Sequence, residues 1–303
     1  MPALHLFLVL LTICIWGVNF VVIKVGLSEM PPLFLCFARF FVTSIPAVFC
    51  INKPAASFGM IALYGFVMYA LQFALLFFAI SAGISAGLAS ILLQLQALFS
   101  VILAAALLGE KIHIWTVAGA VISFSGIGLV GMNLGGEITL AGLILVLMAA
   151  AIWSSGSVIV KKLGGINMFA LVIWGGMIAW PILLAASLLL EGGDQILHLV
   201  QNIRWISIGA VLYIAYLATI FGFGVWNWLL QRHPISKLAP FTLLTPVVGV
   251  VSSSLYLGEP LQSWKILAGV LVVGGLCVNL AGPRFFEAWR KRREKNTVGF
   301  WDF

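Results

Sequence analysis

The sequence predicts an all-α integral membrane protein in which ten transmembrane helices form two inverted five-helix repeats around a central cavity. Composition sets the class, because 63% of the 303 residues are hydrophobic and only 8% are charged. Such a chain has too few polar side chains to cover a soluble globule. The hydrophobic residues gather in runs of about 20, the length that crosses a bilayer as a helix. Two motifs also occur twice, which indicates an internal repeat.

The apolar runs are separated by short loops that hold nearly all the charge. Each run is apolar on every side, whereas a membrane β-strand alternates apolar and polar residues, so a β-barrel is excluded. The first run has no basic leader and no A-x-A cleavage pattern, so we expect an uncleaved helix rather than a signal peptide. The predicted spans are residues 4–26, 33–51, 58–81, 86–108, 113–132, 138–160, 168–190, 205–230, 237–257 and 264–283.

Two motifs relate the halves of the chain. The segment IWGVNFVVIK at 15–24 is echoed by IWSSGSVIVK at 152–161, and Leu-Gly-Glu at 108–110 recurs at 257–259. The first predicted helix thus matches the sixth, and the fourth matches the ninth. Five helices are an odd number, so the second half must insert upside down relative to the first. The predicted units are a first repeat at 1–134, an inverted second repeat at 135–283 and a basic tail at 284–303.

Lys and Arg lie mostly on one side of this topology, and short positively charged loops stay in the cytoplasm. The outer segments keep only Arg204 and Lys265. We therefore expect a multi-pass protein of a bacterial inner membrane with both termini cytoplasmic. The net charge of +7 reports topology, and the basic tail is expected to meet anionic lipid rather than nucleic acid. The cytoplasmic set is Lys53, Lys111, Lys161, Lys162, Arg232, Lys237, Arg284, Arg290, Lys291, Arg292, Arg293 and Lys295.

Four further stretches carry a family resemblance: residues 16–27, AGLASILLQLQ at 86–96, YIAYLATIFGFGVW at 213–226 and LAPFTLLTPVVG at 238–249. On these residues and the repeated motifs, the chain resembles the EamA-type branch of the drug/metabolite transporter superfamily, and within it the bacterial exporters of cysteine and O-acetylserine. The resemblance covers nearly the whole chain. It implies two inverted five-helix repeats, a central cavity and export of amino acids or related metabolites from the cytoplasm, although a shared fold does not identify the cargo. Two inverted repeats around a cavity are in turn expected to work by alternating access.

Arg39 is the charged candidate for the cargo site. A charge inside a bilayer costs a few kcal/mol on insertion scales, so an intramembrane arginine indicates function. Its planar guanidinium can bind a carboxylate through paired hydrogen bonds. The alternative is that the side chain snorkels to the outer headgroups or pairs with a helix carbonyl.

Polar and aromatic residues in the spans complete the expected substrate-binding set. Trp16 and Asn19 share one face of the first helix, whereas Lys24 is expected to snorkel outward. Gln94 and Gln96 point to different faces, so one is expected to line the pathway and the other to join helices, and Gln72 poses the same choice. Thr242, Thr245 and Pro246 indicate a local helix break whose freed carbonyls can meet a solute. The full set is Trp16, Asn19, Arg39, Gln72, Gln94, Gln96, Trp153, Ser157, Trp226, Asn227, Thr242 and Thr245.

No cofactor or metal is expected. Cys14, Cys36, Cys50 and Cys277 fall in apolar spans without C-x-x-C spacing, so we expect buried free thiols. Glu110 and Glu259 of the repeated Leu-Gly-Glu motif are expected to cap helix ends by accepting from backbone amides.

Three classes of function follow. The first is a metabolite or amino-acid exporter, whose partners are a small solute and membrane lipid. The second is a carrier of another cargo, such as a cationic drug, against which Arg39 counts if it faces the cavity. The third is an intramembrane enzyme, which would need a catalytic group of side chains within the spans, and neither an acid nor a histidine lies mid-span.

Overall fold

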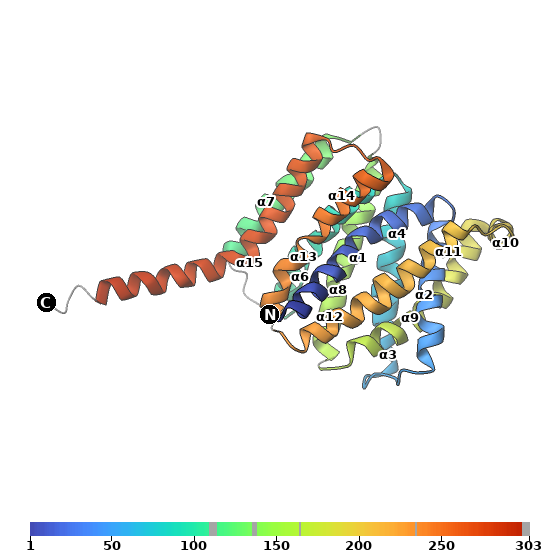
Figure 1. The fold of residues 1–303 in the computed structure, drawn as a ribbon, viewed down its shortest axis with the longest axis horizontal. Helices are drawn as coiled ribbons and strands as arrows, with labels where there is room; N and C mark the ends of the chain where they lie inside the picture. Colours follow the sequence, from blue (N-terminus) through green and yellow to red (C-terminus); the bar gives the residue numbers. More distant parts are fainter. Residues whose placement is uncertain (109–113, 135–137, 164, 234, 299–303) are drawn as a thin grey trace.

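A computed structural model describes residues 1–108, 114–134, 138–163, 165–233 and 235–298, and its regular elements are helices (Figure 1). The elements are α1 Ala3–Leu27, α2 Pro32–Val48, α3 Phe58–Gly65, η1 Phe66–Leu71, α4 Gln72–Ser81, α5 Ala86–Leu92, η2 Leu93–Leu95, α6 Gln96–Leu108, α7 Ile114–Met132, α8 Leu140–Leu163, α9 Met168–Ser187, η3 Leu188–Gly192, α10 Gly193–Gln201, α11 Trp205–Leu212, η4 Tyr213–Phe221, α12 Gly222–Leu230, α13 Ile235–Thr242, α14 Thr245–Leu257 and α15 Ser263–Val298.

Nine helical segments in the described parts of the chain are long and apolar enough to cross a membrane. The remaining predicted run forms α2, an apolar helix of 17 residues. It ends three residues before the predicted boundary, just after Pro46, whose ring removes a backbone donor in the last turn. Length and composition therefore make this a multi-pass membrane protein.

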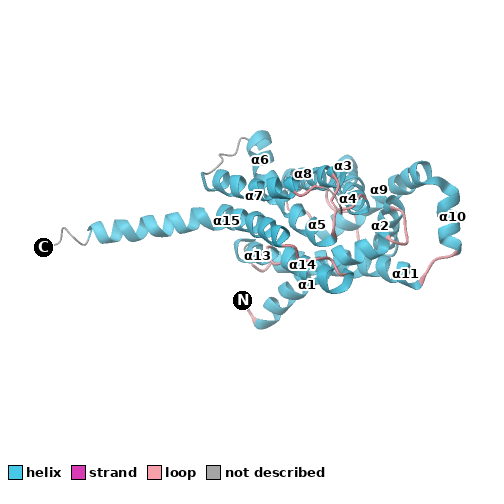
Figure 2. Ribbon diagram, turned by 90° about the horizontal axis from the view of Figure 1, so that it is seen from above, coloured by secondary structure: helices cyan, strands magenta, loops and turns pink. Residues whose placement is uncertain are grey.

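Side-by-side packing joins helices from the two halves of the sequence. The helix α7 lies along α15, α2 packs on α9, and α1 packs on α14, and Figures 1 and 2 show the α7–α15 pair at one side of the bundle. Glycine permits the close approach of α7 and α15, because a Cβ at Gly119 would clash with the carbonyl oxygen of Gly275. Small residues commonly allow such contact between membrane helices.

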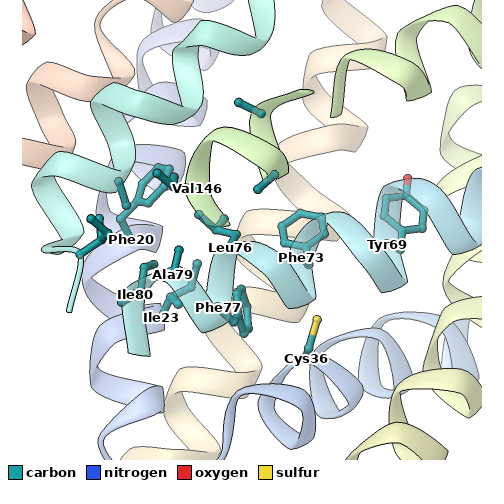
Figure 3. Close-up of a cluster of buried hydrophobic side chains, with 14 of the residues drawn as sticks. Phe20, Ile23, Cys36, Tyr69, Phe73, Leu76, Phe77, Ala79, Ile80 and Val146 are labelled. Atoms are coloured by element: carbon teal, nitrogen blue, oxygen red, sulfur yellow. The ribbon is translucent and has the colours of Figure 1, made fainter. Parts of the chain in front are cut away.

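A buried apolar cluster formed by residues of both halves lies inside the bundle (Figure 3). Ile23, Phe77 and Ile80 are completely buried within it. Large hydrophobic side chains elsewhere remain exposed, Leu189 at 83% for example. Exposed apolar side chains on a membrane helix face lipid, which explains why the runs are apolar all round.

Polar contacts tie the helix ends at one end of the bundle. The Glu259 carboxylate accepts from the backbone amides of Ala86 (2.8 Å) and Gly87 (3.1 Å). Glu191 does the same for the first turn of α2, accepting from Leu33 at 2.6 Å and Phe34 at 3.0 Å. Helix N-termini attract carboxylates because their first amides lack partners. The capping role expected for Glu259 is thus observed, on α5, whereas Glu110 lies outside the described residues.

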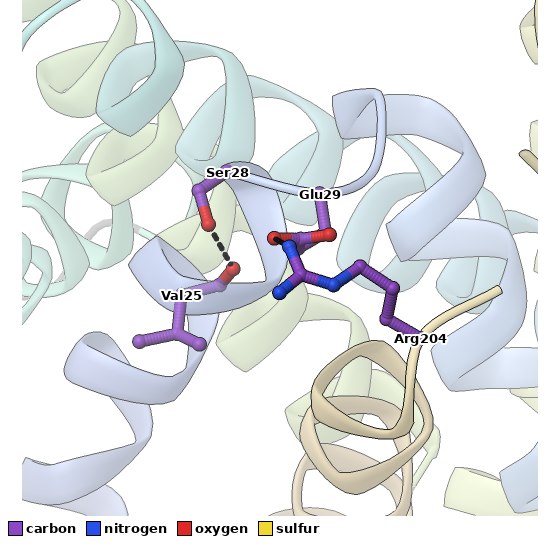
Figure 4. Close-up of polar contacts among 4 residues, drawn as sticks. All are labelled: Val25, Ser28, Glu29 and Arg204. Carbon is purple, nitrogen blue, oxygen red and sulfur yellow. Dashed lines mark hydrogen bonds and ion pairs between the residues drawn. The ribbon is translucent and has the colours of Figure 1, made fainter. Parts of the chain in front are cut away.

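Two basic side chains, Arg204 and Lys24, also form polar contacts at this end of the bundle. Arg204 forms an ion pair with Glu29 at 2.7 Å, and Figure 4 shows it reaching across to the turn that follows α1. The Lys24 ammonium donates to the carbonyl of Ile80 at 3.2 Å, at the C-terminal end of α4. Instead of only snorkelling outward, as the sequence suggested, Lys24 neutralises a helix end.

One further expectation needs correction. All four cysteines are free, but only Cys36 is buried, because Cys14, Cys50 and Cys277 lie on outward faces of the bundle. The predicted span 264–283 matches the apolar part of α15, and this helix continues from it into the basic tail as far as Val298. Glu, Ala, Lys and Arg in that stretch favour a helix.

Candidate substrate cavity

A cavity of about 360 Å³ lies inside the bundle, with walls from both halves of the sequence. Its volume is at the small end of the range for ligand pockets. Gln72 and Asn227, two of the predicted site residues, are not among its lining residues. The predicted residues that line it are Trp16, Asn19, Arg39, Gln94, Gln96, Trp153, Trp226, Thr242 and Thr245.

Arg39, on α2, is buried to 2% exposure and lines the cavity. Its guanidinium carbon lies 3.9 Å from the centroid of the Phe73 ring and 5.3 Å from that of Phe40. Its Nε and Nη1 atoms are buried without a hydrogen-bond partner. The side chain therefore turns into the bundle and does not snorkel to the headgroups. A buried cation with free donors favours an anionic ligand.

Aromatic rings form another wall. The Trp16 ring lies 5.6 Å from Phe223 and 5.4 Å from Trp226. Its indole N–H donates to the carbonyl of Ala218 at 3.0 Å, within the π-helical segment η4. Gly222 leaves room for this ring, because a Cβ there would lie 2.5 Å from the indole nitrogen. π-Helical turns are frequent at functional sites because they shift the backbone bonding pattern.

Two interrupted helices meet at the cavity. The 3₁₀ segment η2 separates α5 from α6, and residues 243–244 separate α13 from α14. The Gln94 amide nitrogen donates to the carbonyl of Thr242 at 2.9 Å, so one break is bonded to the other. The break expected around Thr242, Thr245 and Pro246 is therefore present. Discontinuous helices commonly build transporter binding sites, because their freed backbone groups can be satisfied by solutes.

The predicted residues away from the cavity differ in their surroundings. Gln72 on α4 is completely buried, and neither of its amide atoms has a hydrogen-bond partner. Asn227 on α12 is half-buried. The side chain of Ser157 lies outside the described residues. Of the three glutamines, Gln94 and Gln96 thus both face the cavity, although the expectation was that one of them would only join helices.

The sequence did not single out the apolar residues of the wall. Phe20, Phe73 and Phe223 line the cavity together with several leucines. Ser90 also lines it and donates to the carbonyl of Gly87 at 2.6 Å. In spans that are apolar all round, periodicity does not distinguish a cavity-facing phenylalanine from one that faces lipid.

Comparison with known proteins gives the chain relatives. The sequence model of the EamA-like transporter family matches residues 3–132 and 140–281. A probable amino-acid metabolite efflux pump of Escherichia coli (strain K12) is 39% identical over 290 residues, 94% of this chain and 96% of the relative. The Salmonella typhimurium (strain LT2) protein described in the same words is 39% identical over 284 residues, 92% of this chain and 95% of the relative.

More distant similarities extend over the same length. A probable terminal-alkyne amino-acid exporter of Streptantibioticus cattleyicolor is 26% identical over 300 residues, 95% of this chain and 96% of the relative. A solved crystal structure superposes with a TM-score of 0.64 at 18% identity, covering 92% of this chain and 96% of the other. The two chains therefore share a fold.

Proposed function

Because this chain belongs to the EamA-like transporter family, we propose that it exports amino acids or related small metabolites from the cytoplasm by alternating access. One observation carries the proposal: a cavity inside the bundle contains a buried arginine whose Nε and Nη1 have no partner. Such a group is costly inside a membrane unless an anion visits it. Relatives described as amino-acid metabolite efflux pumps support this class of cargo.

The proposed architecture has ten spans in two inverted repeats. Its support is that features of the first half recur in the second. The segments η1 and η4 place π-helix in the third and eighth predicted spans, and the two helix breaks fall in the fourth and ninth. Contacts are paired in the same way, since α1 packs on α14 and its counterpart α8 packs on α6. The family model also matches each half separately.

The proposed location is a bacterial inner membrane, with both termini in the cytoplasm. The end of the bundle held by Glu191, Glu259 and the Glu29–Arg204 pair is then the outer end. A reporter fused after residue 303 and one inserted near Asp194 should lie on opposite sides of the membrane. Both reporters on the same side would rule out this topology.

In the proposed mechanism, the two halves rock about the cavity. Arg39 binds the carboxylate of the cargo, and Trp16, Trp153 and Trp226 contact its remaining part. Release to the outside requires the contacts of Glu191, Glu259 and the Glu29–Arg204 pair to separate, because each of these joins segments from different halves. The protein then alternates between a state in which the cavity holds cargo behind closed outer contacts and a state in which those contacts are open.

The direct test is solute flux. Purified protein in sealed liposomes should move amino acids down an imposed gradient, whereas empty liposomes should not. A panel of thiol-containing, aliphatic and aromatic amino acids would identify the preferred side chain. Transport of hydrophobic cations with no transport of any amino acid would overturn the proposal and favour a drug exporter, a role that Arg39 in the cavity wall opposes.

A further inference from the structure

The charge of the cavity wall is unbalanced. Among the described residues that line it, Arg39 is the only one with a formal charge, and no carboxylate is present. An amino acid brings an ammonium group together with its carboxylate. That ammonium finds no counter-charge among the described residues of the wall, so it can be satisfied there only by neutral acceptors or by aromatic faces.

Gln94 presents such an acceptor in a fixed orientation. Its Nε2 donates to the carbonyl of Thr242 at 2.9 Å, and that carbonyl belongs to the residue at which α13 ends. Reversing the amide would set its oxygen against another oxygen, so the nitrogen is held in place. Because Nε2 is engaged with Thr242, Oε1 is the amide atom of Gln94 that can accept from a solute, and Gln94 lines the cavity.

Neighbouring groups have the same character. The Oδ1 atom of Asn19 is buried without a hydrogen-bond partner, on a residue that is only 9% exposed. The Oε1 atom of Gln96 also has no partner. The Trp16 and Trp226 rings lie 5.4 Å apart in the same wall and offer π-faces, which attract cations. Acceptors and aromatic faces therefore accompany Arg39 in the wall.

We infer that the cavity binds its cargo as a zwitterion, with the carboxylate on Arg39 and the ammonium on the amide oxygen of Gln94, supported by Asn19. The inference rests on the proposed function and specifies its substrate class as free α-amino acids. An amine without a carboxylate can still reach Gln94 and Asn19, but it leaves Arg39 unpaired and is repelled by its charge. An N-acylated amino acid keeps its carboxylate but has lost the charged donors that Gln94 accepts.

Two sets of probes test this selectivity by calorimetric binding to the purified full chain. One set is L-serine, N-acetyl-L-serine and ethanolamine, and the other is L-leucine, N-acetyl-L-leucine and 3-methylbutylamine. In at least one set the free amino acid should bind about tenfold or more tightly than either derivative, the scale of one hydrogen bond to a charged group. Equal binding of an amino acid and its N-acetyl derivative would overturn the inference and leave the exporter proposal intact. Failure of every amino acid to bind or to be transported would overturn both.

Variants assign the ammonium site. Gln94→Met should reduce amino-acid affinity by about tenfold while leaving N-acetyl binding unchanged, so that the selectivity disappears. Gln94→Glu should strengthen binding of the amine probes, a gain that misfolding cannot produce. Gln72→Met is the matched control, because it removes a buried glutamine amide away from the cavity. Wild-type selectivity in both Gln94 variants would show that the ammonium is held elsewhere.

Discussion

Arg39 is held in position by apolar groups rather than by an ion pair. Phe73 lies under its guanidinium at 3.9 Å, and Nε and Nη1 have no hydrogen-bond partner. A cation on an aromatic face gains on the order of 0.5–2 kcal/mol, much less than a well-formed bond to a carboxylate in a dry site. The environment keeps the cation in place and leaves its donors available for an anion.

We predict that Arg39→Lys weakens binding of carboxylated solutes by about tenfold and that Arg39→Gln weakens it further. Lysine keeps the charge but loses the planar pair of donors. Binding and liposome flux should be measured beside Arg232→Lys, which changes an exposed arginine over the Trp228 ring. Equal transport by both Arg39 variants at normal expression would assign this arginine to helix packing.

For single residues, the sequence could predict which polar side chains are candidates for the site, but not whether each side chain points into the cavity. Arg39, Asn19 and Gln94 are unusual in apolar spans, so the sequence alone marks them as candidates. Gln72 looks equally unusual, yet it is buried away from the cavity. Its orientation depends on how α4 is rotated against α8, and a span that is apolar on all sides carries no periodic signal of that rotation.

Helix ends supply the polar ties between elements. Both Glu259 oxygens accept from the first turn of α5. A glutamine offers one oxygen in place of two and no charge for the helix dipole. We therefore predict that Glu259→Gln lowers the unfolding free energy by about 1–2 kcal/mol.

The measurement for Glu259 is unfolding of the purified protein in detergent. Glu29→Gln is the matched control, because its ion-pair partner Arg204 is 70% exposed and exposed pairs contribute about 0–1 kcal/mol. Equal losses in the two variants would contradict a special capping role for Glu259.

A histidine pair joins the start of α1 to the loop before α13. His5 Nδ1 lies 2.6 Å from His233 Nε2, and the His5 ring meets Trp228 edge-on. Partial desolvation, followed by the charges of His5, the N-terminal ammonium and Lys237, lowers the pKa of His233. The folded state therefore takes up this proton less readily than the unfolded chain.

It follows that the stability linked to the lowered pKa of His233 is fully present above the ordinary histidine pKa of about 6.5 and is lost as pH falls below it. We predict that hydrogen exchange in the first turn of α1, corrected for its intrinsic pH dependence, is faster at about pH 5.5 than at about pH 7.5. His233→Gln should abolish the difference, and the exposed His198→Gln should retain it. A pH-independent exchange rate would contradict the prediction.

At the element scale, the helix break in the ninth span could be predicted, and the π-helical segments could not. The break is predicted by Thr242, Thr245 and Pro246, because proline removes a backbone donor. The segment η4 contains no proline or other comparable marker. Its bonding pattern depends on tertiary contacts such as the Trp16 indole on the carbonyl of Ala218.

For the whole molecule, hydropathy defines the spans well because lipid forces every backbone group into a helix. The predicted runs 58–81, 168–190 and 205–230 begin where the structure begins its helices. Which helices pack against each other could not be predicted in the same way. Pairs such as α7 with α15 depend on small residues, including Gly119 against Gly275. Because glycines are common in membrane helices, their presence does not identify the partner helix.

The positions of the acidic side chains bear on whether transport is coupled to protons. A proton-driven carrier needs a group that binds a proton on one side of the membrane and releases it on the other. Among the described residues, no acid lines the cavity, and Glu191 and Glu259 have both oxygens bonded to helix amides. Glu110 lies outside the described residues.

We therefore predict facilitated export, driven by the gradient of the cargo. In sealed liposomes, the amino acid should reach the same final level with and without an imposed pH gradient. The reason is that no acid among the described residues of the cavity wall can carry a proton across together with the cargo. The Arg39→Gln variant should slow equilibration without changing its end point. Accumulation above equilibrium that is driven by protons and lost in Glu110→Gln or Glu259→Gln would contradict the prediction. That result would place a titrating carboxylate in the transport cycle, and release of Glu259 from the amides of Ala86 and Gly87 would then become the step at which the outer end opens.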